Sequence, residues 1–204
     1  MAFVQKRWSC HQCYCANALY RATRMTVHQQ SFFGATIEIE MHDGMPFTRY
    51  RAGSPKRKSR PPTDCDVVSV MTLIDGWTSG RKIKCAEILK FLPKDPPFLA
   101  ACWRASLSIP AGETRTYGWL AAAAGRPTAH RAAAQSMARN PLAPLVPCHR
   151  VLGANCLGGF CGANASTMGD SPSHWALALK RRLIEIESKP APRTRFSKSK
   201  RKSK

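Results

Sequence analysis

The sequence predicts an α/β N-terminal region followed by a mainly α-helical C-terminal domain that contains a helix-turn-helix. Two segments in the first half, 31–40 and 66–73, have the β-branched and partly alternating composition of strands. The second half instead carries apolar residues at helical spacing, interrupted by Gly and Pro. With 204 residues, 44% of them hydrophobic, the chain is long enough to form one or two domains with a buried core.

The N-terminal half is expected to be irregular. Ile37 and Ile39 alternate with polar neighbours in the strand predicted at 31–40, and a second strand is predicted from Asp66 to Leu73. Between them, residues 51–62 are rich in Lys, Arg and Pro, which predicts a solvated loop or linker.

A helix-turn-helix is predicted in the second half. Thr116 can cap a short helix that ends at Gly125, and Thr128 can cap a second helix that runs to about Arg139 and stops before Pro141. Two short helices joined by a tight Gly-containing turn are the pattern of this motif. Most helical hairpins bind no DNA, so the motif needs support from other features.

Helices predicted at 97–107 and 173–187 flank this motif. We divide the chain into a basic N-terminal region, a remainder with a linker, a more regular helical domain, and a disordered basic tail; their ranges are 1–66, 67–94, 95–187 and 188–204.

The charge points to a polyanionic partner. Lys and Arg number 32 and Asp and Glu number 12, so the formal net charge is +20. Neutralising phosphates with such a chain releases condensed counterions and favours binding. No run approaches the roughly 18 apolar residues of a membrane span. We therefore expect a nucleic-acid partner and no membrane insertion; the alternative is a merely basic soluble protein.

The nine cysteines are expected to be reduced, because residues 1–8 contain Lys6 and Arg7 but no apolar run typical of a secretory signal. Cys10 and Cys13 have the spacing of a zinc-binding pair, and His28 could add a ligand. No second pair follows, so ordinary free thiols are the alternative. We expect no cofactor other than this possible structural zinc.

The segment from Pro147 to Val151 carries a candidate nucleophile. Cys148 stands beside His149 among apolar residues. A thiolate is the reactive form of cysteine, and a neighbouring His can accept the thiol proton while a carboxylate orients the ring. Glu113, Glu185 or Glu187 could supply that carboxylate. The alternative is an inert buried cysteine.

The segment resembles the active site of the O6-alkylguanine-DNA alkyltransferase family, the methylated-DNA–protein-cysteine methyltransferases. The resemblance extends from about Pro97 to Glu187 and is most specific at Pro-Cys-His-Arg-Val. Supporting motifs follow in the family order at 109–117, 125–131, 138–141, 157–160 and 180–187.

The resemblance implies the roles of four catalytic residues. Cys148 would accept the alkyl group, and His149, oriented by Glu187, would act as general base through a water. Asn140 would brace the turn before the cysteine. For the fold, the resemblance implies a degenerate ribonuclease-H-like N-terminal domain and a winged-helix-like C-terminal domain.

The same resemblance implies the DNA and substrate contacts. Tyr117 would press on the phosphate 3′ to the target or donate to guanine, and Arg131 would replace the extruded nucleotide in the stack. Arg150 and the motif Gly158-Gly159-Phe160 would also contact DNA or substrate. The family usually has Tyr at the position of Phe160, and residues 165–173 lengthen the following loop, so we expect a pocket of altered shape.

The resemblance implies direct-reversal repair, in which the alkyl group of O6-alkylguanine in double-stranded DNA moves irreversibly to Cys148. One protein molecule would repair one lesion. One alternative is a non-enzymatic protein that binds alkyl lesions, although relatives of that kind lack the reactive cysteine. A second alternative is a cysteine hydrolase.

Basic runs at 55–60 and 198–204 are typical of nuclear import signals or of non-specific DNA-binding arms. We therefore expect a nuclear, monomeric protein. The alternative for both runs is a solvated linker and tail.

Overall fold

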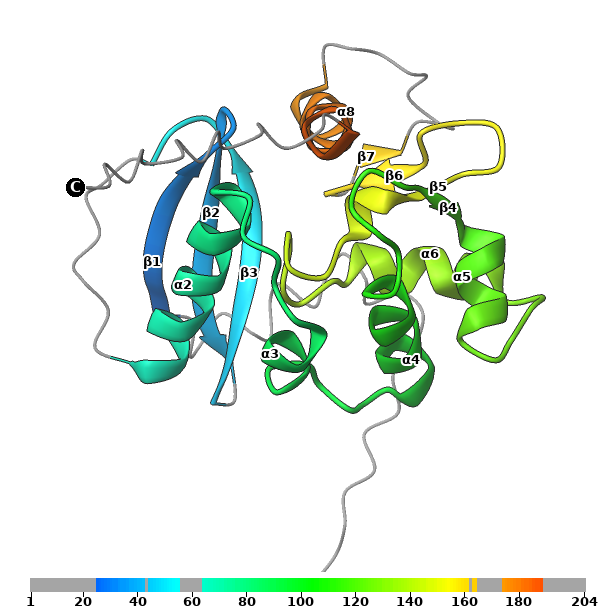
Figure 1. Ribbon diagram of the computed structural model, residues 1–204, viewed down its shortest axis with the longest axis horizontal. Helices are drawn as coiled ribbons and strands as arrows, with labels where there is room; N and C mark the ends of the chain where they lie inside the picture. The colour runs from blue at the N-terminus through cyan, green and yellow to red at the C-terminus, as the bar shows by residue number, and fades with distance from the viewer. Residues whose placement is uncertain (1–24, 43, 56–63, 162, 165–173, 189–204) are drawn as a thin grey trace, which may run out of the picture.

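A three-stranded antiparallel sheet with a helix packed on it lies beside a helical C-terminal part in the computed structural model (Figure 1). The structure describes residues 25–42, 44–55, 64–161, 163–164 and 174–188. The predicted pairing of a mixed N-terminal region with a helical C-terminal domain is therefore confirmed at this coarse level.

The sheet consists of β1 (Met25–Phe32), β2 (Ala35–His42) and β3 (Met45–Ala52) in that order. The strand predicted at 31–40 is only partly correct, because a turn at Phe33 and Gly34 splits it. Both residues have positive φ, 48° and 86°, which is the geometry of a tight hairpin turn. The remainder lies in β2, where Ile37 and Ile39 are fully buried as expected.

The strand predicted from Asp66 to Leu73 is wrong, because this segment lies in helix α2 (Cys65–Thr78). The Asp64 carboxylate accepts hydrogen bonds from the backbone N–H groups of residues 66 and 67 and so caps the helix. Val67, Val70 and Ile74 are buried at helical spacing. α2 lies across the sheet (Figure 1), and the domain boundary placed at residue 66 falls inside it.

The C-terminal part contains helices connected by loops and very short strands. Its helices are α3 (Cys85–Leu89), α4 (Pro97–Ser106), α5 (Tyr117–Ala123), α6 (His130–Ala138), the 3-10 helix η3 (Cys148–Arg150) and α8 (Trp175–Ser188). β4 (Arg115–Thr116) pairs in parallel with β5 (Val151–Leu152), and β6 (Gly159–Phe160) pairs antiparallel with β7 (Ala163–Asn164).

The helices of the predicted helix-turn-helix are present and pack on each other as α5 and α6. Thr116 caps α5 by accepting a hydrogen bond from the N–H of Trp119, as predicted. Thr128 does not cap α6; the N-cap is Ala129, which offers no side-chain hydrogen bond. The flanking helices predicted at 97–107 and 173–187 correspond to α4 and α8.

The two parts are joined by hydrogen bonds between β3 and the loop before η3. The N–H of Thr48 donates to the carbonyl oxygen of Pro141 over 2.7 Å, and its hydroxyl donates to the carbonyl oxygen of Ala143 over 2.8 Å. The sheet therefore contacts the loop that leads to Cys148.

Four regions of the prediction lie outside the described residues. They are Cys10 and Cys13, most of the linker at 51–62, the lengthened loop at 165–173, and all of the basic tail at 188–204 except Ser188. No helix in the part of the chain that the structure describes is long and apolar enough to cross a membrane.

Candidate functional site

Cys148 is the first residue of η3 and is only 7% exposed. Its backbone N–H donates to the carbonyl oxygen of Val146 over 2.8 Å, and the N–H of Arg150 donates to that of Pro147 over 3.0 Å. The tight turn fixes the direction of the thiol. The apolar residues on both sides of the motif explain why it folds inward.

The Asn140 side chain braces the loop before Cys148. Its amide N–H donates to the carbonyl oxygen of Val146 over 2.7 Å, and its Oδ1 accepts from the N–H of Leu142 over 2.9 Å. Asn140 therefore uses both ends of its amide to close one turn of backbone. This position agrees with the bracing role implied by the sequence.

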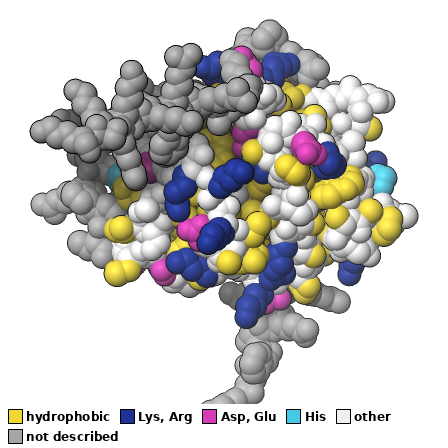
Figure 2. Space-filling model, viewed as in Figure 1, with side chains coloured by type: hydrophobic (Ala, Val, Ile, Leu, Met, Phe, Trp, Pro, Cys, Tyr) yellow, Lys and Arg dark blue, Asp and Glu magenta, His cyan; other side chains and the backbone are white. Residues whose placement is uncertain are grey.

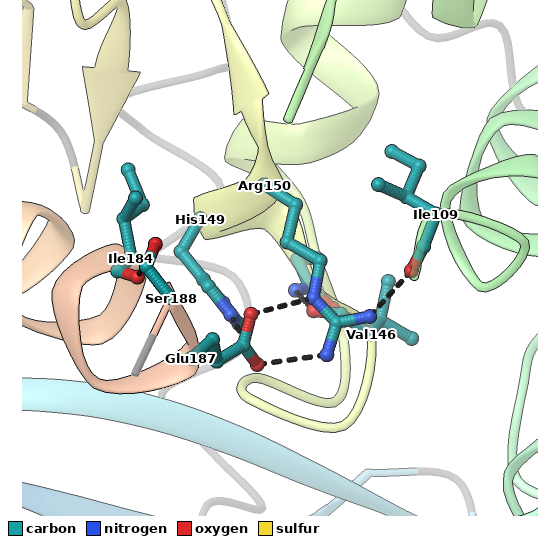
Figure 3. A network of polar contacts seen from close by, with 8 residues as sticks. Ile109, Val146, His149, Arg150, Ile184, Glu187 and Ser188 are labelled. Atoms are coloured by element: carbon teal, nitrogen blue, oxygen red, sulfur yellow. Dashed lines mark hydrogen bonds and ion pairs between the residues drawn. The ribbon is translucent and has the colours of Figure 1, made fainter. Parts of the chain in front are cut away.

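His149 and Arg150 both contact the carboxylate of Glu187, in the last turn of α8 (Figure 3). Nε2 of His149 lies 3.1 Å from Oε1 of Glu187, although the two groups are not aligned as a regular hydrogen bond. Arg150 donates to both carboxylate oxygens, over 2.8 and 2.7 Å, and to the carbonyl oxygen of Ile109 over 2.6 Å. Of the three candidate carboxylates, Glu187 is the one beside His149.

The surroundings of Glu187 and His149 determine the charge of each side chain. Burial alone would raise the pKa of Glu187, but the close contact with His149 and the hydrogen bonds from Arg150 lower it to about 2, so the carboxylate is ionised at neutral pH. Burial lowers the pKa of His149, against the opposing influence of the nearby Glu187 carboxylate. The imidazole is therefore neutral near pH 7 and can accept a proton.

Lys180 is a buried cation beside the thiol that the sequence analysis did not assign to the site. Its Nζ donates to the carbonyl oxygens of Val151, Leu157 and Gly159, over 2.7, 2.7 and 3.1 Å. Burial lowers the pKa of Lys180 to about 8. A signal was available: Lys180 falls on the apolar stripe of α8, between the buried residues Leu179 and Leu183.

The Cys148 thiol receives opposing influences. Burial raises its pKa, whereas a hydrogen bond with Asn140 and the charge of Lys180 lower it. The net direction is upward, so the resting thiol is protonated. Any nucleophilic reaction therefore needs a base within the site, and His149 is the adjacent candidate.

Tyr117 lies at the start of α5 against the Gly158 backbone. Gly158 has φ of 74°, and a Cβ there would lie 2.9 Å from Cε2 of Tyr117. Burial raises the pKa of Tyr117 to about 12, and the charge of Cys148 acts in the same direction. The phenol is therefore protonated at neutral pH and can donate a hydrogen bond.

The structure brings most of the predicted site residues together, with two exceptions. Arg150 was predicted to contact DNA or substrate, but Glu187 and Ile109 hold its guanidinium inside the protein. Arg131 lies apart from the thiol group, exposed on α6, and bonds to none of the described residues. Phe160 is buried in β6, and its ring lies 5.5 Å from that of Tyr50 between centroids.

The predicted zinc pair cannot be placed, because Cys10 and Cys13 lie outside the described residues. His28 lies on β1. Within the described ranges, no three His, Cys, Asp or Glu side chains form a group that could hold a metal ion. Figure 2 shows Lys and Arg side chains spread over several parts of the face in view.

Comparisons with known proteins agree with this site. Residues 97–189 match the family described as 6-O-methylguanine DNA methyltransferase, DNA binding domain. The methylated-DNA–protein-cysteine methyltransferase of Methanosarcina mazei is 43% identical over 86 residues, which are 42% of this chain and 53% of that protein. The chain spans about half the length of the curated relatives it matches.

Solved structures extend the similarity to the N-terminal sheet. The O6-methylguanine methyltransferase of Mycobacterium tuberculosis has a TM-score of 0.54 and 25% identity, covering 80% of this chain and 93% of that chain. The Mycobacterium tuberculosis OGT in complex with DNA has a TM-score of 0.53 and 24% identity, covering 78% and 91% of the two chains. The overall fold is thus that of these methyltransferases, and residues 97–189 of the chain are similar to the family described as 6-O-methylguanine DNA methyltransferase, DNA binding domain.

Proposed function

We propose that this protein is a methylated-DNA–protein-cysteine methyltransferase that repairs O6-alkylguanine in DNA by moving the alkyl group to Cys148. The observation that carries the proposal is the arrangement around the thiol. A buried cysteine, a neutral histidine held by an ionised carboxylate, and a buried lysine occupy one small region. An inert core cysteine needs none of these neighbours.

The reaction is a displacement at the alkyl carbon. His149 takes the thiol proton through a water, and the thiolate sulfur attacks the methyl carbon. The sulfur–carbon bond forms as the bond from carbon to O6 breaks, and the electron pair stays on guanine. Tyr117 donates a hydrogen bond to the leaving guanine anion, which takes a proton from water. Protonated His149 returns its proton to water, so the thiol proton ends on guanine. The thioether is stable, so each molecule reacts once.

The partner in this proposal is double-stranded DNA with an extruded guanine. The net charge of +20 favours a polyanion, and the relative solved in complex with DNA has the same fold. Removing a base from the stack costs a few kcal/mol, which a side chain entering the gap can offset. Arg131, exposed on the second helix of the hairpin, is suited to that role.

Finer features of the fold belong to the proposal as well. The N-terminal sheet and α2 represent a degenerate ribonuclease-H-like domain, and the C-terminal part is winged-helix-like. Residues 95–187 form the compact DNA-binding and catalytic domain, with 1–66 and 67–94 before it and the basic tail 188–204 after it. Limited proteolysis that leaves a stable fragment near residues 90–190 supports these boundaries; cleavage inside that range contradicts them.

Cellular location follows from the same basic runs. We propose that residues 55–60 and 198–204 direct the protein to the nucleus, where it acts as a monomer. A fluorescent fusion that loses nuclear accumulation when the Lys and Arg residues of both runs are replaced by Ala supports this. Unchanged accumulation contradicts it.

The decisive experiment measures the mass of the protein after incubation with duplex DNA that carries O6-methylguanine. We expect the protein to gain one methyl group, located at Cys148 by peptide mass spectrometry, and Cys148→Ala to gain none. Cys85→Ser, at an exposed thiol, is the matched control and should gain the methyl group normally. If the mass of the protein without substitutions stays unchanged while the protein still binds the lesion, the non-enzymatic alternative is established instead.

A further inference from the structure

Tyr50 connects the N-terminal sheet to the thiol site. It lies on β3, where Pro46, Thr48 and Tyr50 are buried on one face. Thr48, on the same face, is hydrogen-bonded to the loop that Asn140 braces. The strand register therefore places the Tyr50 side chain on the side of the sheet that faces the C-terminal part.

Ring contacts link the sheet to Phe160 and, through Trp77, to His149 beside the nucleophile in the sequence. The Tyr50 ring lies 5.5 Å from that of Phe160 and 5.6 Å from that of Phe32, between centroids. Phe32 in turn lies 5.7 Å from Trp77, whose ring is 5.9 Å from that of His149. Aromatic pairs of this kind hold one another in defined orientations. The N-terminal part thus positions side chains beside Cys148.

The hydroxyl of Tyr50 is buried without a hydrogen-bond partner among the described residues. Tyr50 is only 7% exposed and its hydroxyl is buried, so bulk solvent does not supply a hydrogen-bond partner for it. A buried hydroxyl without a hydrogen-bond partner destabilises a fold, and Phe would fill the same space without that penalty. The presence of a phenol at a site that leaves its hydroxyl without a partner therefore suggests a function for that hydroxyl.

The Tyr50 ring contacts that of Phe160, the residue directly before Cys161. The titratable groups whose charge acts on the Tyr50 hydroxyl are the Cys148 thiol on η3, the Cys161 thiol after β6 and the Glu187 carboxylate on α8. Burial raises the pKa of Tyr50 well above its usual value, and negative charge on these three groups acts in the same direction. The phenol is therefore a permanent neutral donor. Lys180, whose charge interacts with Cys148 and Cys161, contributes the opposite sign.

Of these acceptors, Cys148 is the one that gains a charge in the reaction. Both oxygens of Glu187 already accept hydrogen bonds from Arg150. Burial raises the pKa of the Cys161 thiol, so it stays protonated. The Cys148 sulfur becomes an anion when His149 takes its proton, and an anion is a strong hydrogen-bond acceptor.

We propose that the Tyr50 hydroxyl is a catalytic group supplied by the N-terminal sheet, which donates a hydrogen bond to the Cys148 sulfur as the thiolate forms. Tyr50 keeps its proton throughout; it stabilises the anion and is not consumed. This role rests on the alkyl transfer proposed above, and it extends the site beyond residues 97–189. The N-terminal sheet then contributes to the chemistry as well as to the fold.

The test measures how the rate of Cys148 alkylation by iodoacetamide depends on pH, in the full chain, with peptide mass spectrometry to separate this cysteine from the others. Tyr50→Phe keeps the ring and removes the donor. We expect the midpoint of the pH profile to rise by about one unit, because loss of a donor to the thiolate disfavours the anion. The single-turnover rate of methyl transfer should fall about tenfold at neutral pH.

Stability separates this role from a structural one. Because Tyr50→Phe removes an unsatisfied hydroxyl, the melting temperature should be unchanged or slightly higher. Phe33→Leu, at an exposed ring of the same aromatic group, is the control and should leave the pH midpoint in place. If the pH midpoint of Cys148 alkylation is the same in Tyr50→Phe as in the protein without substitutions, the proposal is overturned.

The two proposals fail separately. Iodoacetamide labelling needs no DNA, so a shifted midpoint in Tyr50→Phe supports the Tyr50 hydrogen bond even if the lesion transfers no methyl group. Methyl transfer with an unshifted midpoint would instead support the enzyme activity and reject the role of Tyr50.

Discussion

Arg150 and Glu187 form a two-point ion pair, with Nε to Oε2 at 2.8 Å and Nη2 to Oε1 at 2.7 Å. The same Oε1 lies 3.1 Å from Nε2 of His149. One carboxylate at the end of α8 therefore fixes two consecutive side chains of η3. The nucleophile Cys148 directly precedes these two residues in η3, so its backbone is held by a distant part of the chain.

Replacement of this carboxylate should reveal its energetic role. We expect Glu187→Gln to lower the free energy of unfolding at pH 7 by about 3 kcal/mol, because the pKa of Glu187 is about 2 in the folded protein against an ordinary value of 4.5. A lowered pKa stabilises the fold above about pH 4.5, and this contribution disappears as the pH falls through about 2. Urea unfolding at pH 2, 3, 4.5 and 7 measures it.

The control for this substitution is Glu185→Gln. Glu185 lies on the same helix but is 54% exposed beside Arg182. Exposed pairs contribute little, so the free energy of unfolding should change by less than about 0.5 kcal/mol. If Glu187→Gln and Glu185→Gln show the same loss and the same pH dependence, the buried ion pair is not an important part of the fold.

Removal of the buried cation should affect both stability and chemistry. We expect Lys180→Met to lower the free energy of unfolding by about 2–4 kcal/mol, because the carbonyl oxygens of Val151, Leu157 and Gly159 lose their donor. Loss of positive charge near Cys148 should also raise the pKa of its thiol and slow methyl transfer about tenfold. Urea unfolding and single-turnover kinetics measure the two effects.

Arg182→Met is the matched control, since Arg182 is 55% exposed on α8 and lies beside Glu185. Arg182→Met should change neither the free energy of unfolding nor the rate of methyl transfer appreciably. A Lys180→Met variant with normal kinetics would show that the cation serves the fold alone.

The sequence predicted the C-terminal part more fully than the N-terminal part. Cys148, His149 and Asn140 form a compact motif whose spacing is specific, and Thr116 has the chemistry of a helix cap, which the structure confirms. These features depend on local sequence. Local sequence alone left three carboxylates as candidate partners of His149. The family resemblance implied Glu187, and the fold places that carboxylate beside η3.

Errors in the N-terminal part have physical causes. The β-branched residues from Asp66 to Leu73 favour strand composition, but the cap at Asp64 and the buried stripe of Val67 and Val70 determine a helix. Tertiary packing on the sheet outweighs intrinsic preference there. Tyr50 could not be assigned either, because its link to the thiol depends on how β3 meets the C-terminal loop.

The docking of β3 should influence the thiol from a distance. We expect Thr48→Val to lower the free energy of unfolding by about 1–2 kcal/mol, because the carbonyl oxygen of Ala143 loses its donor at 2.8 Å. Methyl transfer should slow as well, since this loop leads to Cys148. Thr72→Val, which removes an exposed hydroxyl on α2, should stay within about 0.5 kcal/mol. Equal effects of the two variants would mean that the β3 contact is of no special importance.

Gly158 offers a final test of how tightly the substrate side of the site is built. Its φ of 74° is unfavourable for other residues, and a Cβ there would lie 2.9 Å from Cε2 of Tyr117 and 3.0 Å from the backbone nitrogen of Gly153. We expect Gly158→Ala to displace Tyr117, to slow methyl transfer, and to lower the free energy of unfolding by about 2–4 kcal/mol.

Gly80→Ala separates backbone strain from the clash, because Gly80 has φ of 81° and a Cβ added there would meet no atom within 4 Å. This variant should lose only about 1 kcal/mol of stability and keep its transfer rate. Urea unfolding and single-turnover kinetics on both variants provide the comparison. If Gly158→Ala loses no more stability than Gly80→Ala and transfers methyl normally, Tyr117 is not confined by this glycine, and its role as a fixed donor to the leaving guanine must be abandoned.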